Sequence, residues 1–153
     1  MTEPFAGGGS LLDVARRMIA GEIPAPPIAH TLGFTMTSIE KGSARFEMDA
    51  LPERHANPMG TLHGGVLCDI ADGAMGMAFA STLEEGESFT TLELKMNYLK
   101  PVWRTHLVAE GRVIKRGRDI GLIECDVTDQ DGALVAHATS TCMVLRGEKA
   151  AGR

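Results

Sequence analysis

The chain has 153 residues, a length typical of one domain, with 44% hydrophobic and 23% charged residues as in ordinary globular proteins. Its formal net charge of −5 argues against a nucleic-acid-binding role, because domains of that class are usually basic. No apolar run is long enough to span a membrane, and the first ten residues lack the basic and apolar regions of a signal peptide. The three cysteines lie far apart, which indicates free thiols in a reducing cytoplasm.

The N-terminal part predicts a short helix followed by one or two strands. Residues 1–9 end in three glycines and are expected to be flexible. Ser10 is a candidate N-cap, with Asp13 at the capping-box position, and the helix should end near Gly21 before a proline-rich stretch. Residues 34–48 then alternate between apolar and polar side chains, with a turn at Glu-Lys-Gly.

A long helix is predicted over residues 64–82, after a loop over residues 52–63. Apolar side chains cover most of its surface on a helical wheel, so the helix should be mostly buried. The remaining stripe is narrow and consists of Asp69, Asp72, Gly73, Gly76 and Ala80. Each interior glycine costs roughly 1 kcal/mol relative to alanine. We therefore expect the stripe to let a second chain or a ligand approach closely, with a solvated face as the alternative.

The rest of the chain predicts four strands joined by short turns, over residues 90–99, 105–117, 119–129 and 133–145. Strict alternation along the first of them places Thr91, Glu93, Lys95 and Asn97 on one face and Leu92, Leu94, Met96 and Tyr98 on the other. Successive strands with short links must be largely antiparallel, and the long helix has to pack on the sheet that they form. The predicted fold class is therefore α+β.

The start of the long helix carries a motif. A Gly-Gly pair follows a histidine there, and the free N–H groups of a helix start can hold an anion or a developing oxyanion. The motif N-x-x-G-x-x-H-G-G-x-x-x-x-x-x-D-x-A-x-x-x-A is made of Asn57, Gly60, His63, Gly64, Gly65, Asp72, Ala74 and Ala78. It resembles the hotdog-fold acyl-CoA thioesterases, in the PaaI-like branch named for phenylacetic acid degradation. The resemblance covers roughly residues 30–145 and extends to TTLELKMNYLKP and VIKRGR.

The resemblance implies a hotdog fold, in which the sheet wraps around the long helix and two chains join their sheets side by side. The length of the chain favours a single domain, expected over residues 10–146, and the polar residues 147–153 are expected to form a loose tail. The implied activity is hydrolysis of an acyl-CoA thioester to a free acid and coenzyme A. No dinucleotide fingerprint or P-loop is present, so the reaction is expected to need water and a carboxylate without a cofactor.

The same resemblance implies roles for individual residues. Asp72 would act as general base on water or as direct nucleophile, and the Gly64 N–H would polarise the thioester carbonyl. Asn57 would help to place the water or the carboxylate, and His63 would brace the loop or contact the thioester.

Three further assignments concern the hydroxyl partner and the substrate contacts. Thr91 falls where the family carries a hydroxyl near the carboxylate, with its neighbour Thr90 as the alternative if the register differs by one. Gly65 would contact the substrate beside the oxyanion donor. The basic turn is made of Lys115, Arg116 and Arg118. These side chains would bind the phosphates of coenzyme A. The alternative is that they are simply solvated.

The spacing of the motif has a consequence of its own. Gly64 and Asp72 are eight residues apart on one helix, so about 12 Å along its axis. A carboxylate and an oxyanion donor must both lie near one reacting carbonyl. We therefore expect a homo-oligomer, a dimer or a dimer of dimers, in which one chain contributes Asp72 and the other contributes Gly64.

Other candidates have simpler explanations. Asp69 is expected to be a surface charge, with a carboxylate pair as the alternative, and Cys68 a small hydrophobe. The five histidines form no metal-binding motif, so no metal is expected. Two other functions stay open: a hotdog hydratase or dehydratase of acyl thioesters, and a non-catalytic acyl-CoA sensor. The sensor is disfavoured because the first 30 residues leave no room for a DNA-binding module.

Overall fold

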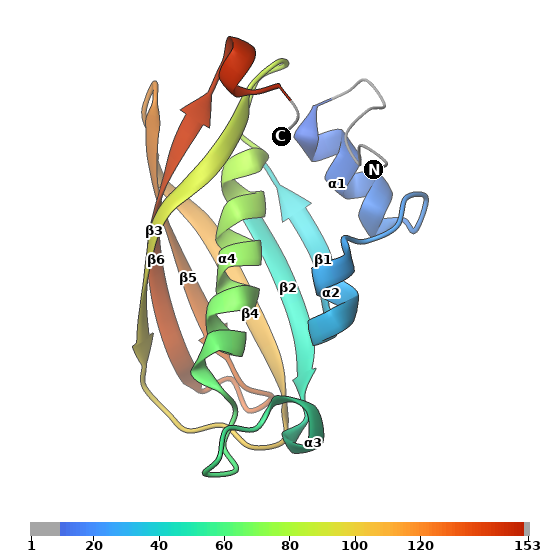
Figure 1. Ribbon diagram of the computed structural model, residues 1–153, viewed down its shortest axis with the longest axis vertical. Helices are drawn as coiled ribbons and strands as arrows, with labels where there is room; N and C mark the ends of the chain where they lie inside the picture. The colour runs from blue at the N-terminus through green and yellow to red at the C-terminus, as the bar shows by residue number, and fades with distance from the viewer. Residues whose placement is uncertain (1–9, 152–153) are drawn as a thin grey trace.

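The computed structural model describes residues 10–151, which form one curved antiparallel sheet with a long helix along its inner face (Figure 1). Its helices are α1 (Leu11–Ile19), α2 (Pro27–Leu32), α3 (Pro52–His55) and α4 (Gly64–Ala80), with a short 3-10 turn, η1 (Gly147–Lys149). Its strands are β1 (Phe34–Glu40), β2 (Ser43–Ala50), β3 (Ser88–Tyr98), β4 (Thr105–Arg116), β5 (Ile120–Thr128) and β6 (Leu134–Leu145). The predicted α+β class, with a hotdog arrangement, is confirmed.

The sheet has the strand order β1-β2-β4-β5-β6-β3, and all neighbouring strands are antiparallel. The strands β4, β5 and β6 follow one another along the chain as expected from short turns. By contrast, β3 pairs with β6 and forms one edge of the sheet, at the opposite side from β1. The edge position of β3 leaves one side of this strand unpaired in the single chain.

The helices at the N-terminal end were predicted only in part. Ser10 caps α1 and forms the capping box with Asp13, as predicted. The helices α2 and α3 were not predicted, because each begins with a proline in its first turn and prolines were interpreted only as helix breakers. Proline is compatible with the first helical turn, where its missing N–H would have no partner. The predicted flexible segment, residues 1–9, lies outside the described residues.

The long helix α4 is enclosed by the sheet. Ten of its 17 residues are buried. They lie around most of the helix circumference, so the buried surface is wider than the single apolar stripe of a surface helix. The helix contacts all six strands, and Figure 1 shows the sheet curving around it. Its buried side chains form the core together with the inward side chains of the strands, such as Leu107, Ile123 and Val127. None of the described helices has the length and apolar character needed to cross a membrane.

Two glycines let the sheet approach α4 closely. A Cβ at Gly111 on β4 would lie 2.5 Å from the backbone carbonyl atoms of Ala74. A Cβ at Gly121 on β5 would lie 2.2 Å from the ring of Phe79. Real Cβ atoms do not approach other heavy atoms so closely, so a larger residue at either position would push the strand away from the helix.

Replacing Gly111 with alanine should lower the free energy of unfolding by at least about 2 kcal/mol, because the added methyl group meets rigid helix backbone. The measurement is urea unfolding followed by circular dichroism. Gly73→Ala is the matched control for packing within the chain, since a Cβ there lies 3.4 Å from the Phe46 ring and fits; a loss above about 1 kcal/mol in this variant would indicate a second chain close to Gly73. A Gly111→Ala protein as stable as wild type would contradict the close packing of β4 on α4.

Candidate active site

The start of α4 presents a backbone N–H that has no partner in the described part of the chain. His63 is the N-cap, and its Nδ1 accepts a hydrogen bond from the Gly65 N–H at 2.9 Å. The His63 carbonyl accepts from the Val66 N–H at 3.0 Å. Within residues 10–151, the Gly64 N–H donates to no protein atom. A free donor at the positive end of a buried helix is suited to stabilise an oxyanion.

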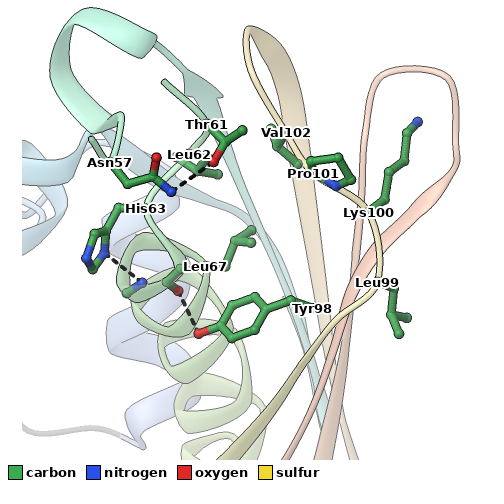
Figure 2. A pocket seen from close by; sticks show the side chains of 12 residues that line it. Asn57, Thr61, Leu62, His63, Leu67, Tyr98, Leu99, Lys100, Pro101 and Val102 are labelled. Atoms are coloured by element: carbon green, nitrogen blue, oxygen red, sulfur yellow. Dashed lines mark hydrogen bonds between the residues drawn. The ribbon is translucent and has the colours of Figure 1, made fainter. Parts of the chain in front are cut away.

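This N–H lies beside a cavity of about 550 Å³. One wall is the segment leading into α4, with Asn57, His63 and Gly64, and the other is the β3–β4 connection, residues 98–102 (Figure 2). The main chain joins the two walls, because the Leu62 N–H donates to the Val102 carbonyl at 2.7 Å. The cavity therefore offers a ligand access to the start of α4.

The Asn57 side chain organises the loop that forms the first wall. Its Nδ2 donates to the Thr61 hydroxyl at 2.8 Å, and its Oδ1 accepts from the Met59 N–H at 2.9 Å. Its backbone N–H also donates to the Thr61 carbonyl at 2.7 Å, which closes the turn. The amide retains a second N–H at Nδ2, so the loop contacts leave one donor for a ligand.

The carboxylate Asp72 lies two turns further along α4; the residue as a whole is exposed on the single chain, although protein atoms partly surround its carboxyl group. The hydroxyl of Thr91 on β3 donates to its Oδ1 at 3.2 Å. Partial burial of the carboxyl group raises the pKa of Asp72 above its ordinary value, and the hydrogen bond from Thr91 opposes this shift. Of the two adjacent threonines, the structure therefore brings Thr91 to Asp72.

A β-bulge puts Thr91 in this position, and here the predicted alternation was wrong. The pairing of β3 with β6 shifts between Thr91 and Glu93, so Leu92 is an extra residue in the strand. As a result Thr91 and Leu94 both face α4, opposite the buried residues Cys142 and Ser140, whereas Leu92 is exposed. Strict alternation had put Thr91 on the face of Glu93, away from the apolar side chains. The polar side chains after the bulge keep their predicted face.

The second carboxylate of the helix, Asp69, is exposed and is not hydrogen-bonded to any side chain among residues 10–151. Partial desolvation of the carboxyl group raises the pKa of Asp69, the negative charge of Asp72 raises it further, and His63 opposes the shift. The charge of Asp72 thus acts on Asp69, and only Asp72 has a hydroxyl partner in the described chain.

The basic turn divides into one engaged and two free side chains. A shift in pairing between Val113 and Lys115 turns Arg116 towards the helix side of the sheet. There its guanidinium lies 5.3 Å from the centre of the Phe79 ring and pairs with Glu87 at 3.2 Å. Lys115 and Arg118 are exposed and form no ion pair within residues 10–151. Only these two cations are therefore free to meet a phosphate.

The glycines of the acidic stripe have neighbours within the same chain. A Cβ at Gly73 would lie 3.4 Å from the Phe46 ring, and a Cβ at Gly76 would lie 3.4 Å from the Phe89 ring. Both distances are ordinary contacts, so the single chain does not require glycine at either position. Close approach of a second chain or of the acyl thioester stays the predicted reason for these two glycines.

The structure thus gathers the candidate residues into two groups on one helix. Asn57, His63, Gly64 and Gly65 surround the start of α4. Asp72 and Thr91 form the second group, about 12 Å along the helix axis.

Sequence reasoning missed one neighbour of the first group, Tyr98, whose hydroxyl donates to the Gly64 carbonyl at 3.2 Å. A signal was present in the sequence, because the only tyrosine of the chain ends the strand that carries Thr91.

Comparison with known proteins identifies the family of this chain. Residues 59–136 match the family model described as the thioesterase superfamily. A Saccharolobus solfataricus protein with a provisional esterase name is 32% identical over 122 residues, covering 80% of this chain and 86% of that protein. Human acyl-coenzyme A thioesterase 13 is 28% identical over 135 residues, covering 86% of this chain and 95% of that protein.

A solved structure is similar over nearly all of its length. The crystal structure of a phenylacetic acid degradation-related protein from Ralstonia eutropha JMP134 has a TM-score of 0.76 and 36% identity, and the match covers 84% of this chain and 98% of that one. The family match includes His63, Gly64 and Gly65 of the first group and both residues of the second, whereas Asn57 and the strands β1 and β2 precede it. The chain belongs to the thioesterase superfamily, with the PaaI-like form of the hotdog fold.

Proposed function

We propose that the protein hydrolyses an acyl-CoA thioester to a free acid and coenzyme A. The observation that carries the proposal is the unpartnered Gly64 N–H at the start of α4, beside a cavity that can admit a substrate. A thioester carbonyl placed there would accept from this N–H as its oxygen becomes negative. Similarity to human acyl-coenzyme A thioesterase 13 supports the choice of acyl-CoA as the substrate class.

The reaction that we propose begins with Asp72 as an ionised carboxylate. As general base, Asp72 removes a proton from water while the water oxygen attacks the thioester carbonyl carbon, and the Gly64 N–H stabilises the resulting oxyanion. The carbon–sulfur bond then breaks, and the proton passes from Asp72 to the departing thiolate. In the alternative, an Asp72 oxygen attacks the carbon, coenzyme A leaves as the thiolate, and water hydrolyses the mixed anhydride.

These two routes differ in where the oxygen atom of water goes. In a single turnover in ¹⁸O-labelled water, the base route puts the label in the released acid. The nucleophile route puts it in the carboxyl group of Asp72 or the acid, depending on which carbonyl of the anhydride the water attacks. Label found in Asp72 by mass spectrometry of the peptide would identify the anhydride.

We further propose that the functional unit is a two-fold dimer with two shared sites. The unpaired edge of β3 supports this arrangement, because a long exposed edge strand tends to pair with another strand. Two copies of β3 related by a two-fold axis would pair antiparallel and bring the two copies of α4 together in opposite directions. Gly64 of one chain would then lie near Asp72 and Thr91 of the other. This pairing would bring the two groups together, although they are about 12 Å apart along the helix of a single chain.

The proposed nucleotide contacts are Lys115 and Arg118. Replacing both with alanine should raise KM for acyl-CoA several-fold, and the effect should be larger at low salt because exposed charges are screened. The same acyl group on N-acetylcysteamine, which has no phosphate, should be hydrolysed at the wild-type rate. Equal loss with both substrates would count against a phosphate contact.

Arg116 needs a separate variant, because its guanidinium is already paired with Glu87 and packed on Phe79. Arg116→Ala should therefore lower the midpoint of urea unfolding, with KM for acyl-CoA changed less than in the double variant of Lys115 and Arg118. A larger KM effect from Arg116→Ala, without a loss of stability, would assign the phosphate contact to Arg116.

The direct test of the proposed function is release of free thiol from a panel of short-chain, medium-chain and aromatic acyl-CoAs. Thiol should appear in equal amount to the free acid with at least one member of the panel. Binding of acyl-CoA without thiol release would indicate a sensor. Addition of water across a double bond of an enoyl-CoA, with the thioester intact, would indicate a hydratase.

A further inference from the structure

Tyr98, the last residue of β3, reaches across to the first residue of α4 (Figure 2). Its hydroxyl donates to the Gly64 carbonyl at 3.2 Å, and the Cys68 sulfur lies 3.3 Å from the same hydroxyl. A Cβ at Gly64 would lie 2.9 Å from three atoms of the tyrosine side chain. The ring therefore lies directly against the glycine, and position 64 has no room for a larger residue while Tyr98 keeps this place.

One peptide group at the start of α4 is held at both ends. The Gly64 carbonyl and the Gly65 N–H belong to the same planar peptide group. Tyr98 donates to the carbonyl, and the N–H donates to His63 Nδ1 at 2.9 Å (Figure 2). In the peptide group before it, the carbonyl accepts from the Val66 N–H and the N–H is the free one of Gly64. The bonds on either side of Gly64 thus set the direction of its N–H.

Such a restraint has a physical purpose here. Two consecutive glycines have more backbone freedom than any other pair of residues, and the first N–H groups of a helix lack partners within the helix. A helix that begins in this way frays unless other groups hold it. Stabilisation of an oxyanion depends on a donor that is already in place before the charge develops.

We propose that Tyr98 is a positioning residue for the oxyanion donor. Its hydroxyl and His63 Nδ1 clamp the peptide group between Gly64 and Gly65, so that the Gly64 N–H points at the bound carbonyl. This inference rests on the proposed function, in which Gly64 binds the oxyanion. In the proposed dimer each β3 strand would then serve both shared sites, because its Thr91 holds Asp72 of one site and its Tyr98 holds Gly64 of the other.

Tyr98→Phe tests the proposal because it keeps the ring and removes only the hydroxyl. We expect kcat to fall about tenfold with KM within about twofold of wild type, since the loss concerns the charge that develops during the reaction. The hydrogen bond with Cys68 and then burial raise the pKa of Tyr98 to about 12, so the hydroxyl stays protonated and the loss should be the same from about pH 6 to 9. A loss that varies with pH over this range would indicate proton transfer by Tyr98 and overturn the proposal.

Cys68→Ala is the matched control. It removes the other neighbour of the hydroxyl and leaves the bond to Gly64, so kcat should stay within about twofold of wild type. If Tyr98 only stabilised the fold, Tyr98→Phe would lower the midpoint of urea unfolding and leave kcat unchanged. Equal losses of kcat in both variants would assign the effect to the thiol contact instead and overturn the clamp.

A second measurement needs no substrate. Hydrogen exchange of the Gly65 amide, followed by NMR, should be at least about tenfold faster in Tyr98→Phe than in wild type or Cys68→Ala. Unchanged exchange would overturn the clamp, and faster exchange with unchanged kcat would overturn its role in positioning. If the wild-type protein releases no thiol from any acyl-CoA, the proposed function fails, while the exchange rates still decide whether Tyr98 holds the peptide group.

Discussion

Replacing Asp72 with asparagine should lower kcat by roughly 10²–10⁴-fold while the protein stays folded. Asparagine has the size of aspartate and keeps an oxygen that can accept the hydrogen bond from Thr91. It has no ionised carboxylate, so it can neither remove a proton from water nor attack a thioester. The measurement is steady-state thiol release with the best acyl-CoA of the panel, with urea unfolding as the check on the fold.

Asp69→Asn is the control for charge on the same face of the helix. Its kcat should stay within a few-fold of wild type, because Asp69 is exposed and has no hydroxyl partner in the described chain. If Asp69→Asn were the variant that loses activity, the assignment of the carboxylate would be wrong.

The pH dependence of kcat/KM is an independent test of the role of Asp72. A general base works only when ionised, so kcat/KM of the wild-type protein should fall as the pH drops through the pKa of Asp72. Because burial raises that pKa, the fall should begin at a higher pH than for an ordinary exposed aspartate. The residual activity of Asp72→Asn should lack this acidic limb.

A mixture of two inactive variants should recover activity if the sites are shared. Asp72→Ala removes the carboxylate, and Asn57→Ala removes the side chain that organises the loop beside Gly64. In a mixed two-fold dimer one site collects both lesions and the other site collects neither. Random pairing makes about half of the dimers mixed, so about a quarter of wild-type activity should return on co-expression.

The two variants need different affinity tags, so that mixed dimers can be purified through both. Each variant alone should be nearly inactive and should elute at the same size as wild type. If both groups came from one chain, every site would carry one lesion and the mixed dimers would be inactive. That result would also remove close approach of a second chain as a reason for glycine at positions 73 and 76.

Much of the fold was predictable because it depends on local patterns. The apolar surface of residues 64–82 marks a buried helix, and alternating side chains with short turns mark antiparallel strands. The capping box of Ser10 and Asp13 is likewise a local signal. The candidate residues could be identified from the family resemblance, because the sequence contains the family's spacing of residues around His-Gly-Gly.

Other features depended on contacts between distant segments. The bulge at Leu92 turns Thr91 towards Asp72, and nothing in the alternation of the strand signals an extra residue there. A similar shift beside Lys115 turns Arg116 inward to Phe79 and Glu87. A slip of one residue exchanges the two faces of a strand, so these orientations followed from pairing with the neighbouring strands.

The sequence by itself determined the α+β class, the buried helix and the set of candidate residues, because hydrophobic periodicity and motif spacing are properties of short segments. Only the tertiary structure decided that Thr91 contacts Asp72, that Arg116 is engaged, and that Tyr98 lies against Gly64. The contact between Tyr98 and Gly64 joins residues 34 positions apart along the chain. Such contacts depend on strand register and on how closely the sheet packs on the helix, which are set when the whole core is assembled.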